Sequence, residues 1–195
     1  MAEGRILMMQ DTIRTYFNES IQIQVAAADT LAQAVEQAAS LLVQSLLSGR
    51  RIFSCGDGNS AFIAHHFTDL LLHGSRLERP PFPAITLGAN STHPNQEECL
   101  SRQISALGSA GDLLVTFVCQ QHSERVHQAM EAALSREMTI VTVVGEEAPE
   151  ITGLLGPSDV EVRIPSSNPA RIVEQQLFFS QLLVDLIERQ IFEGE

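Results

Sequence analysis

The stretch that decides the fold reads Ile52-Phe53-Ser54-Cys55-Gly56-Asp57-Gly58-Asn59-Ser60-Ala61. A short apolar run breaks into glycines and resumes as an apolar-periodic segment, which predicts a strand, a turn and a helix. Such a turn points free backbone N–H groups and a helix N-terminus outward, which suits an anion such as phosphate. The glycines permit the tight backbone, and Asn59 or Ser60 can cap the helix. Because neither a third glycine nor a Lys-Ser/Thr pair follows, a purely structural turn fits the pattern equally well.

The rest of the chain alternates between apolar runs and helical patterns. The apolar runs predict strands at 52–55, 84–87, 113–118, 139–144 and 160–164. The helical patterns lie at 60–73, 96–107, 123–136, 147–155 and 169–190. Short continuous apolar runs are typical of parallel strands covered on both faces, so we expect an α/β, three-layer, doubly wound sandwich with a five-stranded parallel sheet. Ligands of such sheets bind beyond the carboxyl ends of the strands, at the topological switch point.

Two amphipathic helices are expected ahead of the first strand. In the first of them, apolar residues recur four apart at Met9, Ile13, Phe17, Ile21 and Val25. A second helix restarts at Asp29 or Thr30 and is closed by Gly49. We therefore expect a single domain, with a helical hairpin over residues 9–48 and an α/β core over 50–193. The apolar surface of such a hairpin must be buried, and a second subunit is the simplest way to bury it. The alternative is that the hairpin packs on the sheet of its own chain.

Composition and charge argue against nucleic acid as a partner and against a membrane location. The chain has 24 acidic and 12 basic residues, a formal net charge of −12, which repels a nucleic-acid backbone. Direct binding of DNA or RNA is therefore not expected. The three cysteines, Cys55, Cys99 and Cys119, lie far apart and form no Cys-x-x-Cys pair, as expected of reduced thiols in a cytoplasmic protein. No apolar run has the length of a signal peptide or a membrane span, so no membrane association is expected.

Three other groups of residues can carry chemistry or contacts. His65, Asp69 and His73 share one helical face, but histidines beside an acid on a helix are more often hydrogen-bonded pairs than metal ligands, so we expect no metal there. Ser123 can cap a helix beside the crevice that Ser60 faces, or be an ordinary capping serine. Ile191 and Phe192 end the last helix. An exposed Phe forgoes about 1.5–3 kcal/mol of burial, so it packs on a neighbour or serves a partner.

Several motifs, taken in series, resemble the sugar isomerase (SIS) domain. They read SCGDGNSA at 54–61, AHHF at 64–67, ERPPFPAI at 78–85, RQISALG at 102–108, GDLL at 111–114 and ARI at 170–172, together with 157–165. They are most similar to the branch that contains sedoheptulose-7-phosphate isomerase and the DnaA initiator-associating protein. The resemblance covers about residues 10–193. It implies a flavodoxin-like fold with five parallel strands, and a homotetramer whose N-terminal helices build a central bundle.

The chain departs from the isomerase pattern at its reactive positions. In the pattern, a His is followed four positions later by Glu; here His66 matches the His, but Leu70 replaces the Glu. On the C-terminal helix Glu174 is kept, but Val173 and Gln181 replace a Gln and a His. An aliphatic side chain neither coordinates a metal nor transfers a proton, and an amide has no useful pKa. The resemblance thus implies that His66 and Glu174 are vestigial and that no cofactor is needed; zinc enters only if the chain is an isomerase.

The phosphate-binding segments of the pattern are also altered. The family's second loop, Ser-Thr-x-Gly-Asn-Ser, reads VCQQHS at 118–123, so only Ser123 is kept. Asp57 replaces an Asn of the first loop and adds a negative charge where an anion would sit, which argues against phosphate. The chain is also several residues shorter than the pattern between Leu87 and Gly108. The groups left for a sugar phosphate are Gly58, Asn59, Ser60 and Ser123.

These features predict a non-catalytic adaptor that resembles the DnaA initiator-associating protein and regulates the initiation of chromosomal replication through protein contacts. In that relative a Leu-Phe pair near the C-terminus contributes to the contact with the initiator, so the resemblance implies that Ile191 and Phe192 bind DnaA here. The alternatives are a phosphoheptose (sedoheptulose-7-phosphate) isomerase and a non-catalytic sugar-phosphate sensor. The expected partners are three further copies of the chain, DnaA and, for the sensor, a sugar phosphate.

Overall fold

The sheet of the computed structural model has the predicted five parallel strands. The structure describes residues 2–88 and 98–193, with side chains from residue 8 onward. The strands are β1 (Ile52–Gly56), β2 (Ala84–Thr86), β3 (Leu113–Val118), β4 (Thr139–Val144) and β5 (Val160–Arg163). They lie in the order β2-β1-β3-β4-β5, and every pair is parallel. This order is the flavodoxin-like one, with its switch point between β1 and β3, so the predicted fold class is confirmed.

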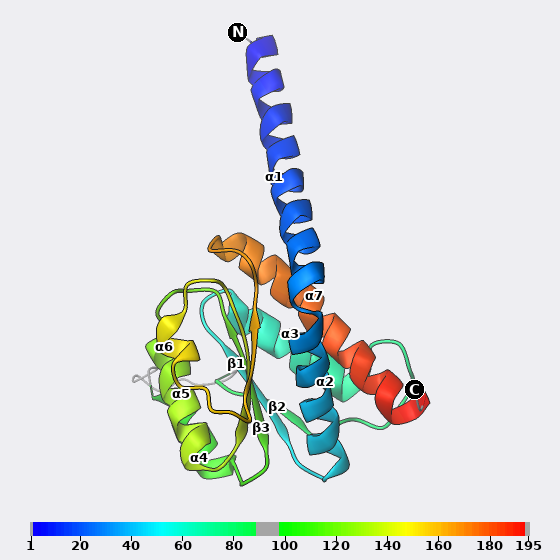
Figure 1. Cartoon of the computed structure of the whole chain (residues 1–195), viewed down its shortest axis with the longest axis vertical. Helices are drawn as coiled ribbons and strands as arrows, with labels where there is room; N and C mark the ends of the chain where they lie inside the picture. Colours follow the sequence, from blue (N-terminus) through cyan, green and yellow to red (C-terminus); the bar gives the residue numbers. More distant parts are fainter. Residues whose placement is uncertain (1, 89–97, 194–195) are drawn as a thin grey trace.

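Helices cover both faces of the sheet. Those of the α/β part are α3 (Ser60–His73), α4 (Cys99–Leu107), α5 (Glu124–Ser135), α6 (Pro149–Thr152), α7 (Pro169–Glu188) and the π-helix η1 (Arg189–Glu193). Together with α2 (Ala32–Leu47), α3 and α7 lie on one face, and α4, α5 and α6 lie on the other (Figure 1). Residues 89–97 lie outside the described part, and with them the start of the helix expected at 96–107 and most of the shortened segment.

Side-chain alternation along the strands divides the core into two clusters. In β3, Val115 and Phe117 pack in the cluster beneath α2, α3 and α7, whereas Leu114 and Val118 pack in the cluster beneath α4, α5 and α6. Strand residues of both sets are almost fully buried. Because both faces are covered, no position of the central strands can be polar without an internal partner, which explains the continuous apolar runs of the sequence.

The N-terminal helices differ from the expected hairpin. Helix α1 (Ala2–Thr30) is followed by α2 after the single residue Leu31. Thr30 does not cap α2; its hydroxyl group donates back to the Ala26 carbonyl at 2.8 Å. Backbone hydrogen bonds of 2.9 Å join Leu31 to Ala27 and Val35 to Leu31, so helical bonding continues across the junction. The chain therefore bends at Leu31 without reversing, and α1 projects from the body of the molecule (Figure 1).

Two helix starts show how the sequence sets the ends of elements. Pro169 opens α7, and the Asn168 side chain accepts a hydrogen bond from the Ala170 N–H at 3.1 Å, as an N-cap does. The expected cap of α3 is not formed, because Asn59 occupies the N-cap position without a side-chain bond to the helix. The Ser60 hydroxyl group has another partner, described below. Among the described residues, no helix combines the length and the apolar character needed to cross a membrane.

Candidate functional site

The turn after β1 and the loop after β3 lie side by side at the switch point of the sheet. Gly56, the last residue of β1, is in register with Phe117 of β3, and the Asp57 N–H donates to the Phe117 carbonyl at 3.2 Å. Parallel strands bring these two connections to the same edge, as the sequence predicts. We call the space between them the switch-point crevice; its walls are residues 57–60, residues 119–123 and the start of α7.

The carboxylate of Asp57 occupies backbone donors of the second loop. It accepts the Cys119 N–H at 2.9 Å, the Gln120 N–H at 3.2 Å and the Cys119 thiol at 3.4 Å. Burial raises the pKa of Asp57 and outweighs these hydrogen bonds, which lower it. The sequence predicts that this charge repels an anion; in the structure, the carboxylate is itself the anion that these N–H groups bind.

Gln176 closes the crevice from the side of α7. This fully buried side chain accepts a hydrogen bond from the Ser60 hydroxyl at 2.6 Å. Its amide nitrogen donates to the carbonyl groups of Val118 and Val143, at 3.1 and 2.9 Å. One side chain thus joins the first turn, β3 and β4. Sequence reasoning missed Gln176, although an amide on the buried face of an apolar helix is a signal, because a buried polar group requires partners.

The Gln120 side chain of the second loop lies close to Gly58 of the first turn. Gly58 has a φ of +41°, and a Cβ atom there would lie 3.3 Å from the side-chain nitrogen of Gln120, so this side chain lies against the turn. The cavity on the β4 side of Cys119 and Gln120 has a volume of about 10 Å³. A volume of about 10–15 Å³ holds one water molecule, so this hollow, lined by the second loop, the loop after β4 and the start of α7, has room for about one.

The four predicted phosphate-binding residues do not form one open site. Gly58 and Asn59 are exposed, whereas Ser60 is fully buried and its hydroxyl group is bound to Gln176. Ser123 occupies the N-cap position of α5, as predicted for a capping serine, but its side chain makes no capping hydrogen bond. The backbone donors most suited to an anion, those of Cys119 and Gln120, were not among the predicted groups.

His66 and Glu174, the two positions that match the reactive residues of the isomerase pattern, have different surroundings. His66 is half-buried, and its Nε2 atom is buried without a hydrogen-bond partner among the described residues. Glu174 accepts hydrogen bonds from Ser20 of α1 at 2.5 Å and pairs with Arg171 at 2.7 Å. Leu70 and Val173, where the isomerase pattern has Glu and Gln, pack against the core.

Metal-ligating side chains are dispersed. Within residues 2–88 and 98–193, no three His, Cys, Asp or Glu side chains lie close enough to hold a metal ion. His73 and Asp69 form an exposed contact of 3.5 Å one helical turn apart. Cys55, Cys99 and Cys119 are free and buried, and burial raises the pKa of Cys55 to about 12. The Cys55 thiol is therefore protonated at neutral pH.

The C-terminal patch, which we define as Phe82, Ile191 and Phe192, lies at the far end of α7 from the crevice (Figure 1). Phe192 is 46% exposed, and its ring stacks on Phe82 with centroids 6.0 Å apart and planes at 20°. Ile191 is half-buried and packs against the core. Phe192 therefore packs on a neighbouring residue, as one interpretation predicts, and still leaves about half of its surface exposed, as the other requires for a partner.

Comparison with known proteins places these features in a family. The family model of the SIS domain matches residues 15–145. The chain belongs to the SIS domain family. Among curated relatives, the DnaA initiator-associating protein DiaA of Shigella flexneri is 42% identical over 191 residues, which cover 94% of this chain and 97% of the relative.

Solved SIS domain structures share the whole architecture. A phosphoheptose isomerase from Francisella tularensis superposes with a TM-score of 0.87 at 33% identity, covering 92% of this chain and 97% of that one. The phosphoheptose isomerase from Neisseria gonorrhoeae gives a TM-score of 0.86 at 28% identity, covering 92% and 98%. This SIS domain thus shares its fold with phosphoheptose isomerases and a larger fraction of its sequence with DiaA.

Proposed function

We propose that this SIS domain protein is a non-catalytic adaptor that associates with the initiator DnaA and regulates the initiation of chromosomal replication. The observation that carries the proposal is 42% identity to DiaA over almost the full length of both chains. We assign the contact with DnaA to Ile191 and Phe192 of the C-terminal patch, where Phe192 is exposed.

The state of the crevice supports an adaptor over an enzyme. A ketose–aldose isomerase must move a proton, and a phosphorylated substrate needs free backbone or hydroxyl donors. Here the carboxylate of Asp57 accepts the N–H groups of Cys119 and Gln120, and Gln176 accepts the hydroxyl of Ser60. Leu70 and Val173 can neither transfer a proton nor bind a metal.

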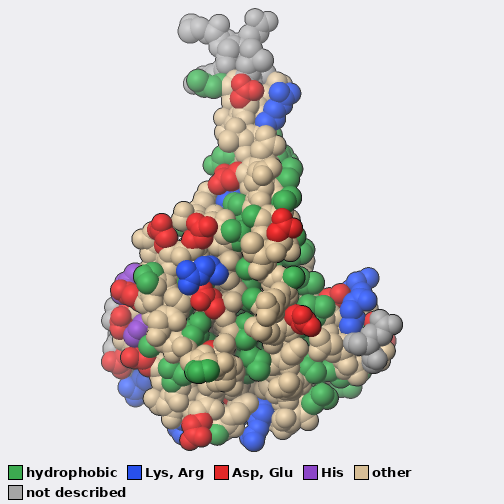
Figure 2. All heavy atoms as spheres, viewed as in Figure 1, with side chains coloured by type: hydrophobic (Ala, Val, Ile, Leu, Met, Phe, Trp, Pro, Cys, Tyr) green, Lys and Arg blue, Asp and Glu red, His purple; other side chains and the backbone are tan. Residues whose placement is uncertain are grey.

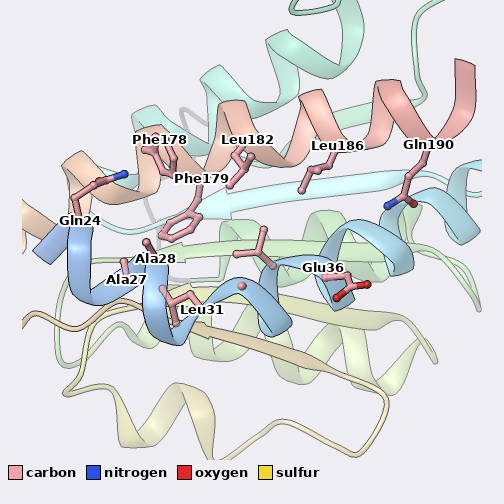
Figure 3. A pocket seen from close by; sticks show the side chains of 12 residues that line it. Gln24, Ala27, Ala28, Leu31, Glu36, Phe178, Phe179, Leu182, Leu186 and Gln190 are labelled. Atoms are coloured by element: carbon pink, nitrogen blue, oxygen red, sulfur yellow. The ribbon is translucent and has the colours of Figure 1, made fainter. Parts of the chain in front are cut away.

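We propose that the chain assembles into a homotetramer through its N-terminal helices. Large apolar side chains are exposed along α1, among them Ile13, Phe17 and Ile21, and Figure 2 shows apolar side chains along this projecting helix. An apolar groove of about 380 Å³ continues this surface at the base of α1. In Figure 3, Phe179, Leu182 and Leu186 point from α7 toward Leu31 and α2 across the groove. A second copy of α1 is the occupant that such a surface fits.

Four copies would present four C-terminal patches and hold several DnaA molecules at high effective concentration. The net charge of −12 opposes direct contact with DNA, so the adaptor acts through DnaA. The same proposal places the protein in the cytoplasm, where its buried thiols remain reduced. Sedimentation velocity of the purified chain checks the assembly, with a particle of four chains as the expected result.

The contact is tested by titrating purified DnaA with the wild type and with Phe192→Ala in a calorimeter. Removing a central aromatic contact is expected to weaken binding by about thirtyfold, the loss typical of a hot-spot residue. The matched control is Phe62→Ala, because Phe62 is 71% exposed on α3 and lies outside the C-terminal patch. Equal affinities of Phe192→Ala and the wild type would remove the proposed contact. Absence of binding by the wild type would refute the adaptor itself.

The second candidate, a phosphoheptose isomerase, is favoured by the TM-score of 0.87 with the Francisella enzyme at 33% identity. It predicts turnover of sedoheptulose 7-phosphate when zinc is added. The adaptor proposal predicts none above the background of the buffer. A non-catalytic sensor is distinguished from both by a thermal shift, because a ligand at a hundred times its dissociation constant stabilises the fold by about 2.7 kcal/mol.

A further inference from the structure

The connection between α3 and β2 contacts the end of α7 through a cluster of side chains whose central ion pair is buried. We call it the Arg79 cluster; it consists of Ser75, Arg79, Phe82 and Glu188. The side chains of Arg79 and Glu188 are each only 2% exposed, and they form an ion pair of 2.9 Å. Glu188 is the last residue of α7, immediately before η1, which contains Ile191 and Phe192 of the C-terminal patch.

Both members of the pair are fully supported by hydrogen bonds. Glu188 also accepts the N–H and the hydroxyl of Ser75, at 3.0 and 3.1 Å. The Arg79 guanidinium donates to the carbonyl groups of Leu70 and Leu71, in the last turn of α3, at 3.0 and 2.9 Å. Burial alone would raise the pKa of Glu188, but the bonds from Ser75 and Arg79 outweigh it and lower the pKa of this carboxyl. The pair therefore fixes the end of α7 to the end of α3.

The cluster also supports the exposed aromatic ring. The guanidinium carbon of Arg79 lies 3.9 Å from the ring centroid of Phe82, a cation–π distance. Phe82 is buried and in turn stacks with Phe192. A chain of contacts thus runs from the buried ion pair through Phe82 to the exposed ring of Phe192.

The approach of the connection to α7 depends on a glycine. Gly74 has a φ of +85°, and a Cβ atom there would lie 2.7 Å from the Leu77 carbonyl oxygen and 3.6 Å from a carboxylate oxygen of Glu188. Any other residue would be strained at this φ and would clash with the Leu77 carbonyl within the connection.

From this geometry we propose that the Arg79 cluster positions Phe192 for its partner, with Arg79 and Phe82 as positioning residues that hold the ring in its binding orientation. The inference rests on the proposed contact between Phe192 and DnaA. A short π-helix at a chain end would otherwise fray, and the ring would have to be ordered at the moment of binding. Ordering it in advance lowers that cost.

The test is a double-mutant cycle on affinity for purified DnaA, using the full chain. Phe82→Leu is expected to weaken binding by about threefold to tenfold, the range for one side chain that must be newly ordered on binding. In the Phe192→Ala background, the same substitution is expected to change nothing, because there is no ring left to position. Phe82→Tyr keeps the aromatic ring and is expected to retain most of the affinity.

Each outcome decides between positioning and its rivals. If Phe82→Leu weakens binding equally in both backgrounds, Phe82 contacts DnaA directly and the positioning role is wrong. If Phe192→Ala weakens binding but Phe82→Leu does not, the contact stands and the positioning role fails alone. If Phe192→Ala has no effect, both the contact and the positioning role fail.

A second measurement does not need the partner. Amide hydrogen exchange at residues 189–193 is expected to be faster in Phe82→Leu and in Arg79→Lys than in the wild type, whereas exchange in α5, on the other face of the sheet, is unchanged. Arg79→Lys keeps the charge but loses the planar fork that reaches Glu188 and the carbonyls of α3 together. Unchanged exchange in both variants would show that the cluster does not order η1, and the proposal would be withdrawn.

Discussion

The switch-point crevice and the C-terminal patch differ in where their key side chains find partners. In the crevice, the groups that could bind a phosphorylated ligand bind each other, because Asp57 accepts backbone N–H groups and Gln176 accepts the Ser60 hydroxyl. At the C-terminal patch, the polar groups of Arg79 and Glu188 are satisfied beneath the surface, and an aromatic ring remains exposed above them. The first region is closed on itself and the second is prepared for contact.

The contrast between the crevice and the patch shows that a buried polar site and a protein-binding surface need different kinds of support on this fold. A site that has lost its ligand must still satisfy its buried donors, and side chains of the protein can do this with a gain in rigidity. A protein surface needs no such closure, but it needs a support that holds an aromatic anchor in place. The predictions below test each half of this comparison, beginning with the largest expected effect.

We expect the largest loss of stability when the ion pair beneath the C-terminal patch is broken. Glu188→Gln removes the carboxylate charge that pairs with the buried Arg79, so we expect the free energy of unfolding to fall by about 3–5 kcal/mol in urea denaturation. The matched control is Asp185→Asn, one turn earlier on α7, whose carboxylate pairs with Arg76 and Arg189 nearer to solvent. That change should cost no more than about 1 kcal/mol. Equal costs for the two variants would mean that the Arg79 cluster has no special role.

We expect the second-largest loss of stability when Gln176, which closes the crevice, loses its hydrogen bonds. Gln176→Leu leaves the Ser60 hydroxyl and the carbonyl groups of Val118 and Val143 without their buried partner, which we expect to cost about 2–3 kcal/mol in thermal unfolding. The neighbouring Gln175 is the control, because it is also buried but its Oε1 atom has no hydrogen-bond partner among the described residues. Gln175→Leu should be neutral or stabilising. A loss of stability in Gln175→Leu as large as in Gln176→Leu would contradict the assignment.

Much of the fold could be predicted from the sequence because its strands are covered on both faces. A strand buried on both sides must be apolar throughout, so β3 and β4 were predicted with the bounds that the structure has. The junction of α1 and α2 was predicted as a hairpin because Asp29 and Thr30 are good N-cap residues. The hydroxyl of Thr30 bonds within α1 instead, and no glycine or proline interrupts the helical backbone.

Only those features of the site that depend on residues close together in the sequence could be predicted. The turn at 55–60 was placed correctly at the carboxyl end of the first strand, because the strand, turn and helix are consecutive in the chain. The partner of Asp57 is 62 residues away, and that of Arg79 is 109 residues away. Pairings over such distances depend on the register of the sheet and the approach of α7, which single residues do not encode. The Arg79 cluster was therefore not predicted, although Arg79 and Phe82 belong to the motif ERPPFPAI at 78–85.

Removal of the Asp57 charge should give the smallest change in stability and the most informative change in binding. In Asp57→Asn an amide replaces the carboxylate, and it can no longer accept both N–H groups, so one donor becomes free for an anion. We expect inorganic phosphate to raise the melting temperature of this variant in a concentration-dependent way and to leave the wild type unchanged. Asp159→Asn is the control, because Asp159 also accepts two backbone N–H groups, those of Ile140 and Gly156, outside the crevice.

The pH dependence of the same variant checks the charge of the closed crevice. Because the folded-state pKa of Asp57 is raised by burial, its contribution to stability is fully present below the unfolded pKa of about 3.9 and is lost as the pH rises through the folded value. The difference in unfolding free energy, wild type minus Asp57→Asn, should therefore decrease with pH across that interval and be constant above it. A difference that increases with pH would mean that the hydrogen bonds from Cys119 and Gln120 outweigh burial. The crevice would then be a strong anion site that Asp57 merely occupies, and phosphate should compete for it in Asp57→Asn with correspondingly high affinity.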